Sequence, residues 1–123
     1  MTYQEQLKNI ELASNGFPPN NISLSQRIFS DLVLAKKWKD VQFEANQGLQ
    51  TCIFLAREPE KTCNQLFIIP VLQDEANLSM DNIAYMFDSI KTPVEKLTLA
   101  IYSSDSAIVY YHISKGLVKA TQH

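Results

Sequence analysis

Histidine and cysteine are the side chains best suited to acid–base, nucleophilic or metal chemistry near neutral pH, and this chain has two of each. His112 stands in an apolar strand pattern and His123 is the last residue, while Cys52 and Cys63 lie in apolar and loop surroundings. A zinc site needs further ligands clustered together, and a nucleophile needs a base within reach. Neither pattern is present, so we expect no catalytic residue, no metal site and no cofactor. His112 is expected to be a strand-surface or interface residue, and both cysteines are expected to be free thiols in a reducing compartment.

The charged residues offer two further candidates for function. Acidic pairs occur at 58–60 and 74–75, in stretches that read as loops, where a solvated role explains them better than acid–base work. A basic cluster at 36–39 (KKWK) could contact a phosphate backbone, but a solvated helix end beside a core tryptophan is the interpretation we favour. The net charge of −2 lacks the basic excess of a domain that binds nucleic acid alone, so any contact with RNA would be local or shared with partners.

The composition indicates one folded domain. A chain of 123 residues is long enough for one hydrophobic core, and only three glycines argue against a glycine-rich phosphate loop. No apolar run approaches the roughly 20 residues of a membrane-spanning helix, so we expect no membrane span. Residues 1–14 mix charges of both signs without an apolar block, unlike a secretory signal.

The first structural element expected along the chain is an N-terminal leader. We expect residues 1–21 to be a flexible, loosely attached leader, with a short helix over 3–14 and a break at 15–21 (NGFPPNN). A strong helix follows, with Ser23 or Ser25 as its N-cap and lysines in its last turn. Its 3.6-residue pattern places four apolar side chains on the core face: Leu24, Ile28, Leu32 and Ala35.

Three strand patterns come next. Residues 41–43 read as a strand that is followed by a turn at 45–48. Residues 49–57 are apolar on both faces and should form a central strand. Residues 65–72 form a third strand after a loop, and Pro70, which has no N–H to donate, marks an edge or a bulge in it.

A second core helix and a hairpin complete the domain. Ser79 is the predicted N-cap of this helix, Pro93 ends it, and its core face carries Ile83, Phe87 and Ile90. The resulting order of helix, three strands, helix and two strands predicts an α+β fold with a mixed β-sheet flanked by helices. We place the domain at 22–118, with a tail at 119–123.

The hairpin at 96–116 (KLTLAIYSSDSAIVYYHISKG) is the most informative segment. Two apolar strand patterns flank a Ser/Asp turn, and the second strand carries paired tyrosines close to the end of the chain. A last strand is often an edge strand, whose unpaired N–H and C=O groups are available to another chain. The segment therefore points to assembly with a partner.

Three segments carry a resemblance to a known family: SDLVLAKKWKDV, LQTCIFLAR and, most specifically, LTLAIYSSDSAIVYYHISKG. From about Ile22 to Gly116 the chain resembles the smallest, structural subunit of the eukaryotic tRNA-splicing endonuclease. The resemblance implies a fold like the C-terminal domain of archaeal tRNA-splicing endonucleases. It also implies a non-catalytic subunit of a heterotetrameric enzyme that cleaves precursor tRNA at both intron boundaries.

The resemblance also implies where catalytic residues would lie. Catalytic subunits of this enzyme use a Tyr–His–Lys triad for a metal-independent cleavage, and the histidine would fall near residues 62–67, where the sequence has none. Lys91 lies roughly where the triad lysine would fall, but alone it cannot supply both an acid and a base. We therefore expect that the chain is not an enzyme.

Two interaction surfaces of the family can be carried over to matching residues. The turn at 103–106 matches a loop that projects acidic character into a basic pocket of a neighbouring subunit, and only Asp105 is charged here. The strand at 107–113 matches the one that pairs edge to edge with the partner catalytic subunit. The expected interface residues are Ser104, Asp105, Ser106, Ile108, Tyr110, Tyr111, Ile113 and Leu117.

The expected partners are therefore the catalytic and structural subunits of the endonuclease, with precursor tRNA reached through the complex. When isolated, the chain is expected to form a homodimer through its last strand. The resemblance implies the nucleus or, if the chain is fungal, the cytosolic face of the mitochondrial outer membrane. Two alternatives stay open at this point: a stand-alone protein-interaction adaptor unrelated to RNA, and a small nuclease acting alone, which the missing histidine disfavours.

Overall fold

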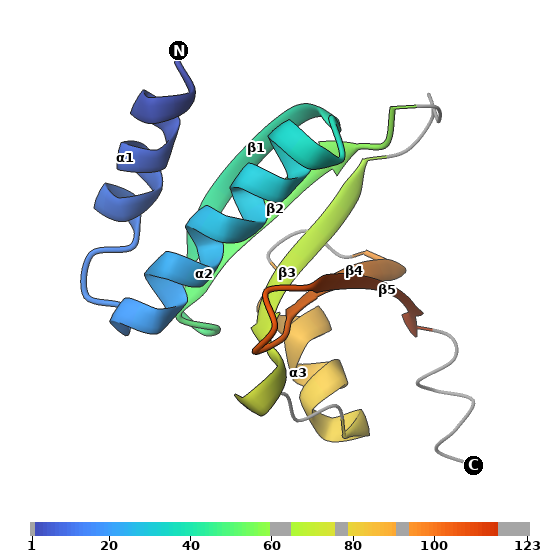
Figure 1. Ribbon diagram of the computed structural model, residues 1–123. Helices are drawn as coiled ribbons and strands as arrows, with labels where there is room; N and C mark the ends of the chain where they lie inside the picture. The colour runs from blue at the N-terminus through green and yellow to red at the C-terminus, as the bar shows by residue number, and fades with distance from the viewer. Residues whose placement is uncertain (1, 60–64, 76–78, 91–93, 116–123) are drawn as a thin grey trace.

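A computed structural model of the chain describes residues 2–59, 65–75, 79–90 and 94–115 (Figure 1). The elements within these residues are, in chain order, α1 (Tyr3–Ala13), α2 (Pro19–Ser30), the π-helical turn η1 (Asp31–Ala35), β1 (Lys39–Asn46), β2 (Thr51–Arg57), β3 (Leu66–Leu72), the short 3₁₀ turn η2 (Gln73–Glu75), α3 (Met80–Ser89), β4 (Lys96–Tyr102) and β5 (Ile108–Ser114).

The five strands form one open mixed sheet in the order β1-β2-β3-β4-β5. Neighbouring strands are antiparallel except β3 and β4, which run parallel and are separated in the chain by α3, as a parallel connection requires. α2 covers one face of the sheet with α1 beside it, and α3 lies on the other face (Figure 1). The predicted α+β fold with a mixed sheet flanked by helices is confirmed.

The sheet separates two hydrophobic cores. The α2-side core lies between the sheet and α2, and it includes Phe29 and Phe54, whose ring centroids are 6.2 Å apart. The α3-side core combines Phe87 and Ile90 with apolar residues of the strands. Successive residues of β2 and β4 point alternately into the two cores, which explains why both strands are apolar on both faces. The predicted central strand is therefore confirmed as β2.

The N-terminal segment is packed against α2. Ile10 and Ser14 are fully buried, and the Tyr3 ring stacks on Phe29 with centroids 6.0 Å apart. The predicted short helix is confirmed as α1. Its predicted loose attachment is corrected, because these side chains belong to the α2-side core. The division of the chain into leader, domain and tail stays a prediction.

The start of α2 lies earlier than the sequence predicts. The helix begins at Pro19 rather than after Ser23 or Ser25, so the predicted break at 15–21 is shorter. Proline is tolerated in the first helical turn because its missing N–H would have no partner within the helix there. The hydroxyl of Ser25, freed from a capping role, is buried and bonds to Thr51 Oγ1 at 3.0 Å.

The end of α2 changes the predicted core face. Leu24, Ile28 and Leu32 are buried as predicted, but Ala35 is exposed. The reason is η1, in which the Lys36 N–H donates to the carbonyl of residue 31, five positions back, over 2.8 Å. This wider winding rotates the side chains that follow it relative to an α-helix.

Smaller differences concern turns and ends. β1 continues to Asn46, so the first hairpin turn lies at 47–50 rather than at 45–48. The β2–β3 ladder ends at Ile68, and Pro70 pairs with β4 alone, as its missing N–H predicts. Ser79 caps α3 as predicted, accepting from the backbone N–H of residue 82 at 3.2 Å. Pro93, the predicted end of this helix, lies outside the described residues.

Candidate subunit interface

β1 and β5 are the two edges of the described sheet, and they differ in how open they are to pairing. β1 has a register irregularity between Lys39 and Gln42, where Asp40 has a positive φ of 54°. Such irregularities and outward charges hinder the addition of another strand. β5 pairs with β4 without interruption along its whole length. The prediction that the last strand lies at an edge is confirmed, and this edge has no comparable irregularity.

Two backbone hydrogen bonds at the ends of the hairpin determine which groups of β5 face outward. The Ser103 N–H donates to the Ala107 carbonyl at 2.9 Å, and the Lys115 N–H donates to the Glu95 carbonyl at 2.7 Å. Both pairs continue the β4–β5 register, in which hydrogen-bonded and non-hydrogen-bonded pairs alternate. Odd-numbered residues of β5 therefore bond to β4. The groups on the free side belong to the even-numbered residues Ile108, Tyr110, His112 and Ser114.

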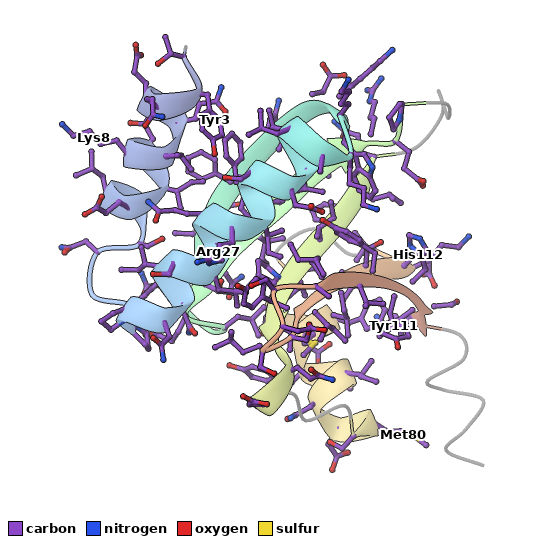
Figure 2. All side chains as sticks on the ribbon, viewed as in Figure 1. Tyr3, Lys8, Arg27, Met80, Tyr111 and His112 are labelled. Atoms are coloured by element: carbon purple, nitrogen blue, oxygen red, sulfur yellow. The ribbon has the colours of Figure 1, made fainter. Side chains whose placement is uncertain are left out.

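The odd-numbered residues of β5 form an apolar surface on the α3 side of the strand. Val109 is 47% exposed and Tyr111 is 54% exposed, whereas Ile113 packs partly buried against the α3-side core. Figure 2 shows Tyr111 and His112 on opposite sides of β5. Val109 is missing from the predicted interface, although the two-residue period of a strand would have placed it beside Tyr111. Leu117 lies outside the described residues.

Tyr110, on the other face, is anchored to the helical layer. Its hydroxyl donates to Asp31 Oδ2 at 2.6 Å, its ring centroid is 5.7 Å from that of Trp38, and the Lys36 ammonium lies 5.6 Å from the ring centroid. Burial, together with the hydrogen bond and negative charge of Asp31, raises the pKa of Tyr110 well above its ordinary value. The phenol is therefore a neutral donor that binds within its own chain. The groups of Tyr110 that remain available to a partner are its outward backbone N–H and C=O.

Two further residues share this face of β5. Ile108 is half-buried against the α2-side core. His112 is exposed, and its Nδ1 lies 2.8 Å from the hydroxyl of Thr98, which is buried in β4. The prediction of a strand-surface histidine is confirmed.

The turn between β4 and β5 is held by its own hydrogen bonds. Asp105 accepts from the Ser103 hydroxyl and from a backbone N–H within the turn, and these bonds lower the pKa of its carboxyl. Ser106 has a φ of 70° and accepts a hydrogen bond from the Tyr102 hydroxyl at 3.2 Å. Ser104 is exposed between them. The turn thus presents an ionised carboxylate in a defined conformation.

The sequence model of the family described as "Sen15 protein" matches residues 27–123, which include the last turn of α2 and the whole sheet. The chain belongs to the Sen15 family. Sen15 proteins are the small structural subunits of tRNA-splicing endonuclease, so this chain is a non-catalytic subunit that associates with the other subunits of that enzyme. The resemblance and the non-catalytic role predicted from the sequence are confirmed. No curated protein matched the chain.

The described part of this Sen15-family chain contains one further group that could carry chemistry, the thiol of Cys52. Cys52 is buried in the α2-side core, where desolvation raises the pKa of its thiol and its Sγ lies 3.3 Å from Ser14 Oγ. The described residues contain no group of three His, Cys, Asp or Glu side chains that could hold a metal ion. Across those same ranges, no helix is long and apolar enough to cross a membrane. Cys63, Lys91 and residues 62–64 lie outside the described part of the chain.

The basic cluster at 36–39 surrounds a tryptophan that packs on the core. Trp38 is partly buried against the α2-side core, and its backbone N–H donates to the Leu32 carbonyl at 2.8 Å just after η1. Lys36, Lys37 and Lys39 are all exposed, and the ammonium of Lys36 lies over the Tyr110 ring. The favoured interpretation of this cluster, a solvated helix end beside a core tryptophan, is confirmed.

Replacing Tyr110 by Phe should measure how strongly the Sen15-family chain holds its edge strand. The variant loses the hydrogen bond to the Asp31 carboxylate, so we expect the free energy of unfolding to fall by about 1.5 kcal/mol. Tyr111→Phe removes the same hydroxyl from an exposed ring and should change stability by less than about 0.5 kcal/mol. Urea unfolding followed by circular dichroism gives both values. Equal effects of the two substitutions would contradict the anchoring role of Tyr110.

Proposed function

We propose that this subunit docks onto a neighbouring endonuclease subunit through the outer edge of β5 and the turn that precedes it. The observation that carries the proposal is the regular, uninterrupted edge of β5, in contrast to the irregular and charged edge of β1. The contact residues we propose are Ser104, Asp105, Ser106, Ile108, Tyr110, Tyr111, Ile113 and Leu117, with Val109 added because it is exposed beside Tyr111.

In this arrangement the partner adds a strand to the sheet. The outward N–H and C=O groups of Ile108, Tyr110, His112 and Ser114 supply backbone hydrogen bonds, which are largely independent of sequence. Specificity comes from side chains. Val109 and Tyr111 offer apolar area that is now in water, and aromatic residues are enriched at the centre of protein interfaces.

The turn supplies an electrostatic contact. Asp105 is the charged residue of the turn, and its lowered pKa keeps the carboxylate ionised at neutral pH. Because it lies at the tip of the hairpin, beyond the ends of β4 and β5, it can enter a basic pocket of the neighbouring subunit while β5 pairs alongside.

Reversing the charge of Asp105 tests this contact. We expect Asp105→Lys to weaken association with the other endonuclease subunits about tenfold, because a favourable charge pair becomes a repulsive one. Titration of the labelled chain into the remaining subunits at two salt concentrations would show the loss and its decrease at high salt.

Two control variants separate charge from fold in that experiment. Asp105→Asn keeps an acceptor for the Ser103 hydroxyl and should give an intermediate loss. Asp81→Lys makes the same charge reversal at an exposed position in the first turn of α3 and should leave association unchanged. If Asp105→Lys and Asp81→Lys behave alike, the turn has no specific electrostatic role.

The same edge of β5 allows the isolated chain to pair with a second copy of itself. In isolation, β5 pairs with β5 of a second copy to give a symmetric homodimer, because an unpaired edge is complementary to itself when antiparallel. A sedimentation measurement that finds only monomers at high concentration would refute this pairing.

Precursor tRNA is reached through the assembled complex, in keeping with a net charge of −2. We place the complex in the nucleus or, in a fungus, at the cytosolic face of the mitochondrial outer membrane, which microscopy of the tagged chain would decide.

A further inference from the structure

A positively charged side chain that forms no ion pair with a carboxylate of the described residues lies beside the docking turn. Arg27 projects from the exposed face of α2, and its guanidinium carbon is 5.3 Å from the centroid of the Tyr102 ring (Figure 2). Tyr102 is the last residue of β4, and its hydroxyl donates to Ser106 in the turn. No carboxylate of the described residues forms an ion pair with Arg27; the ion pair within those residues joins Arg57 and Asp40.

Two surface hollows meet at this arginine. One, of about 550 Å³, lies between α1, α2 and the start of β5 and includes Ile108 in its lining. The other, of about 420 Å³, lies between α2, β3 and the turn and includes Ser103 and Ser104. Arg27 and Tyr102 line both hollows. The cation is therefore next to both structures that we propose as the docking surface, the turn and the first residue of β5.

The position of the guanidinium over the Tyr102 ring is suited to binding an anion. A guanidinium supported by an aromatic ring keeps the N–H groups at its own edge available, where they can form two parallel hydrogen bonds to one carboxylate or phosphate. Contact with the ring also reduces the conformational entropy that the long side chain would lose on binding. Ser23 lines both hollows and adds a hydroxyl that can donate to the same anion.

Charge decides between a carboxylate and a nucleic-acid phosphate. Asp31 lines one hollow and Asp74 the other, while Arg27 is the cation among the residues that line them. Nucleic acid is bound by clusters of cations that neutralise several phosphates together, whereas Arg27 is the one cation among the described residues that line these hollows. A single carboxylate needs one arginine only.

We propose that Arg27 binds a carboxylate side chain of the endonuclease subunit that docks on β5. This inference rests on the proposed docking edge and adds a contact of opposite sign to that of Asp105. The chain then gives an acidic group to its partner at the tip of the turn and receives an acidic group at its base. Such a reciprocal arrangement favours one alignment of the two subunits over a register slip, because a slip along β5 would separate both charge pairs.

The test compares variants of Arg27 in the complex reconstituted from co-expressed endonuclease subunits. We expect Arg27→Gln to weaken association about tenfold and Arg27→Lys, which keeps the charge but loses the planar fork, to weaken it less. Lys8→Gln removes one positive charge from an exposed position of α1 and should leave association unchanged. Melting curves of the isolated variants check that each is folded, and Arg27→Lys carries the test if Arg27→Gln does not fold.

The partner's acidic group can be found in the same system. Its Asp and Glu residues are replaced one at a time by Asn and Gln, and the correct replacement should add no further loss in the Arg27→Gln background. Unchanged association of both Arg27 variants, while a block of the β5 edge abolishes it, would overturn the inference and leave the proposed docking intact. Normal association with weakened binding of precursor tRNA would also overturn it, because Arg27 would then bind a phosphate.

Discussion

The substitution His112→Pro should prevent β5 from pairing with a partner subunit while the domain stays folded. The N–H of this residue points away from β4, so proline removes a hydrogen-bond donor from the free edge and places its ring where the partner strand would lie. We expect association with the other endonuclease subunits to weaken at least about 100-fold. The homodimer of the isolated chain should be lost as well, which analytical ultracentrifugation would show.

The adjacent residue provides a matched control for that experiment. The N–H of Tyr111 points towards β4, so Tyr111→Pro breaks the hairpin ladder and should destabilise the domain by about 3 kcal/mol or more. His112→Ala loses the contact to the Thr98 hydroxyl but keeps the backbone N–H, so it should associate normally. If His112→Pro and His112→Ala associate equally well, the outer edge of β5 is not the docking surface.

The second large effect is expected in the core, at Phe54. This ring is completely buried, with the centroids of Phe29 at 6.2 Å and Phe43 at 6.4 Å. Phe54→Ala leaves a cavity between α2 and the sheet, and its free energy of unfolding should fall by about 3–5 kcal/mol. Because the domain is small, this change corresponds to a melting temperature lower by about 10 °C or more. Urea unfolding monitored by tryptophan fluorescence would give the value.

An exposed apolar residue supplies the comparison for Phe54. Leu34 is 57% exposed, and Leu34→Ala should change the free energy of unfolding by less than about 0.5 kcal/mol. Below its melting temperature, Phe54→Ala should still associate with the other subunits, because β3 and β4 separate β2 from the docking edge. A loss of less than about 1 kcal/mol would show that the cavity closes by rearrangement of the rings around it.

Much of the fold could be predicted because it follows from local patterns. The 49–57 segment has an unbroken apolar run at 52–56. Such a run predicts a strand buried on both faces, and β2 is such a strand. The pattern at 83–90 and the cap at Ser79 likewise identify α3. The edge position of β5 was predicted from its place at the end of the hairpin, and the sheet order agrees.

The errors have a common origin in tertiary contacts. The burial of Ile10 and Ser14 depends on α1 lying along α2, which the short and weakly amphipathic pattern at 3–14 does not require. The early start of α2 at Pro19 and the exposure of Ala35 both reflect how the chain enters and leaves that helix. Periodicity describes the interior of a helix well, but it contains little information about an irregular winding such as η1.

The candidate interface likewise has some properties that follow from the local sequence and others that depend on tertiary contacts. Residue types and strand alternation determined the hairpin of β4 and β5, with its acidic turn and its aromatic second strand, and those properties are local. The three-dimensional packing decided which backbone groups of β5 face outward, because that choice depends on the register with β4. It also decided that Tyr110 is tied to Asp31, and that Arg27 lies over Tyr102, because these contacts join helix and hairpin residues that only the folded sheet brings together.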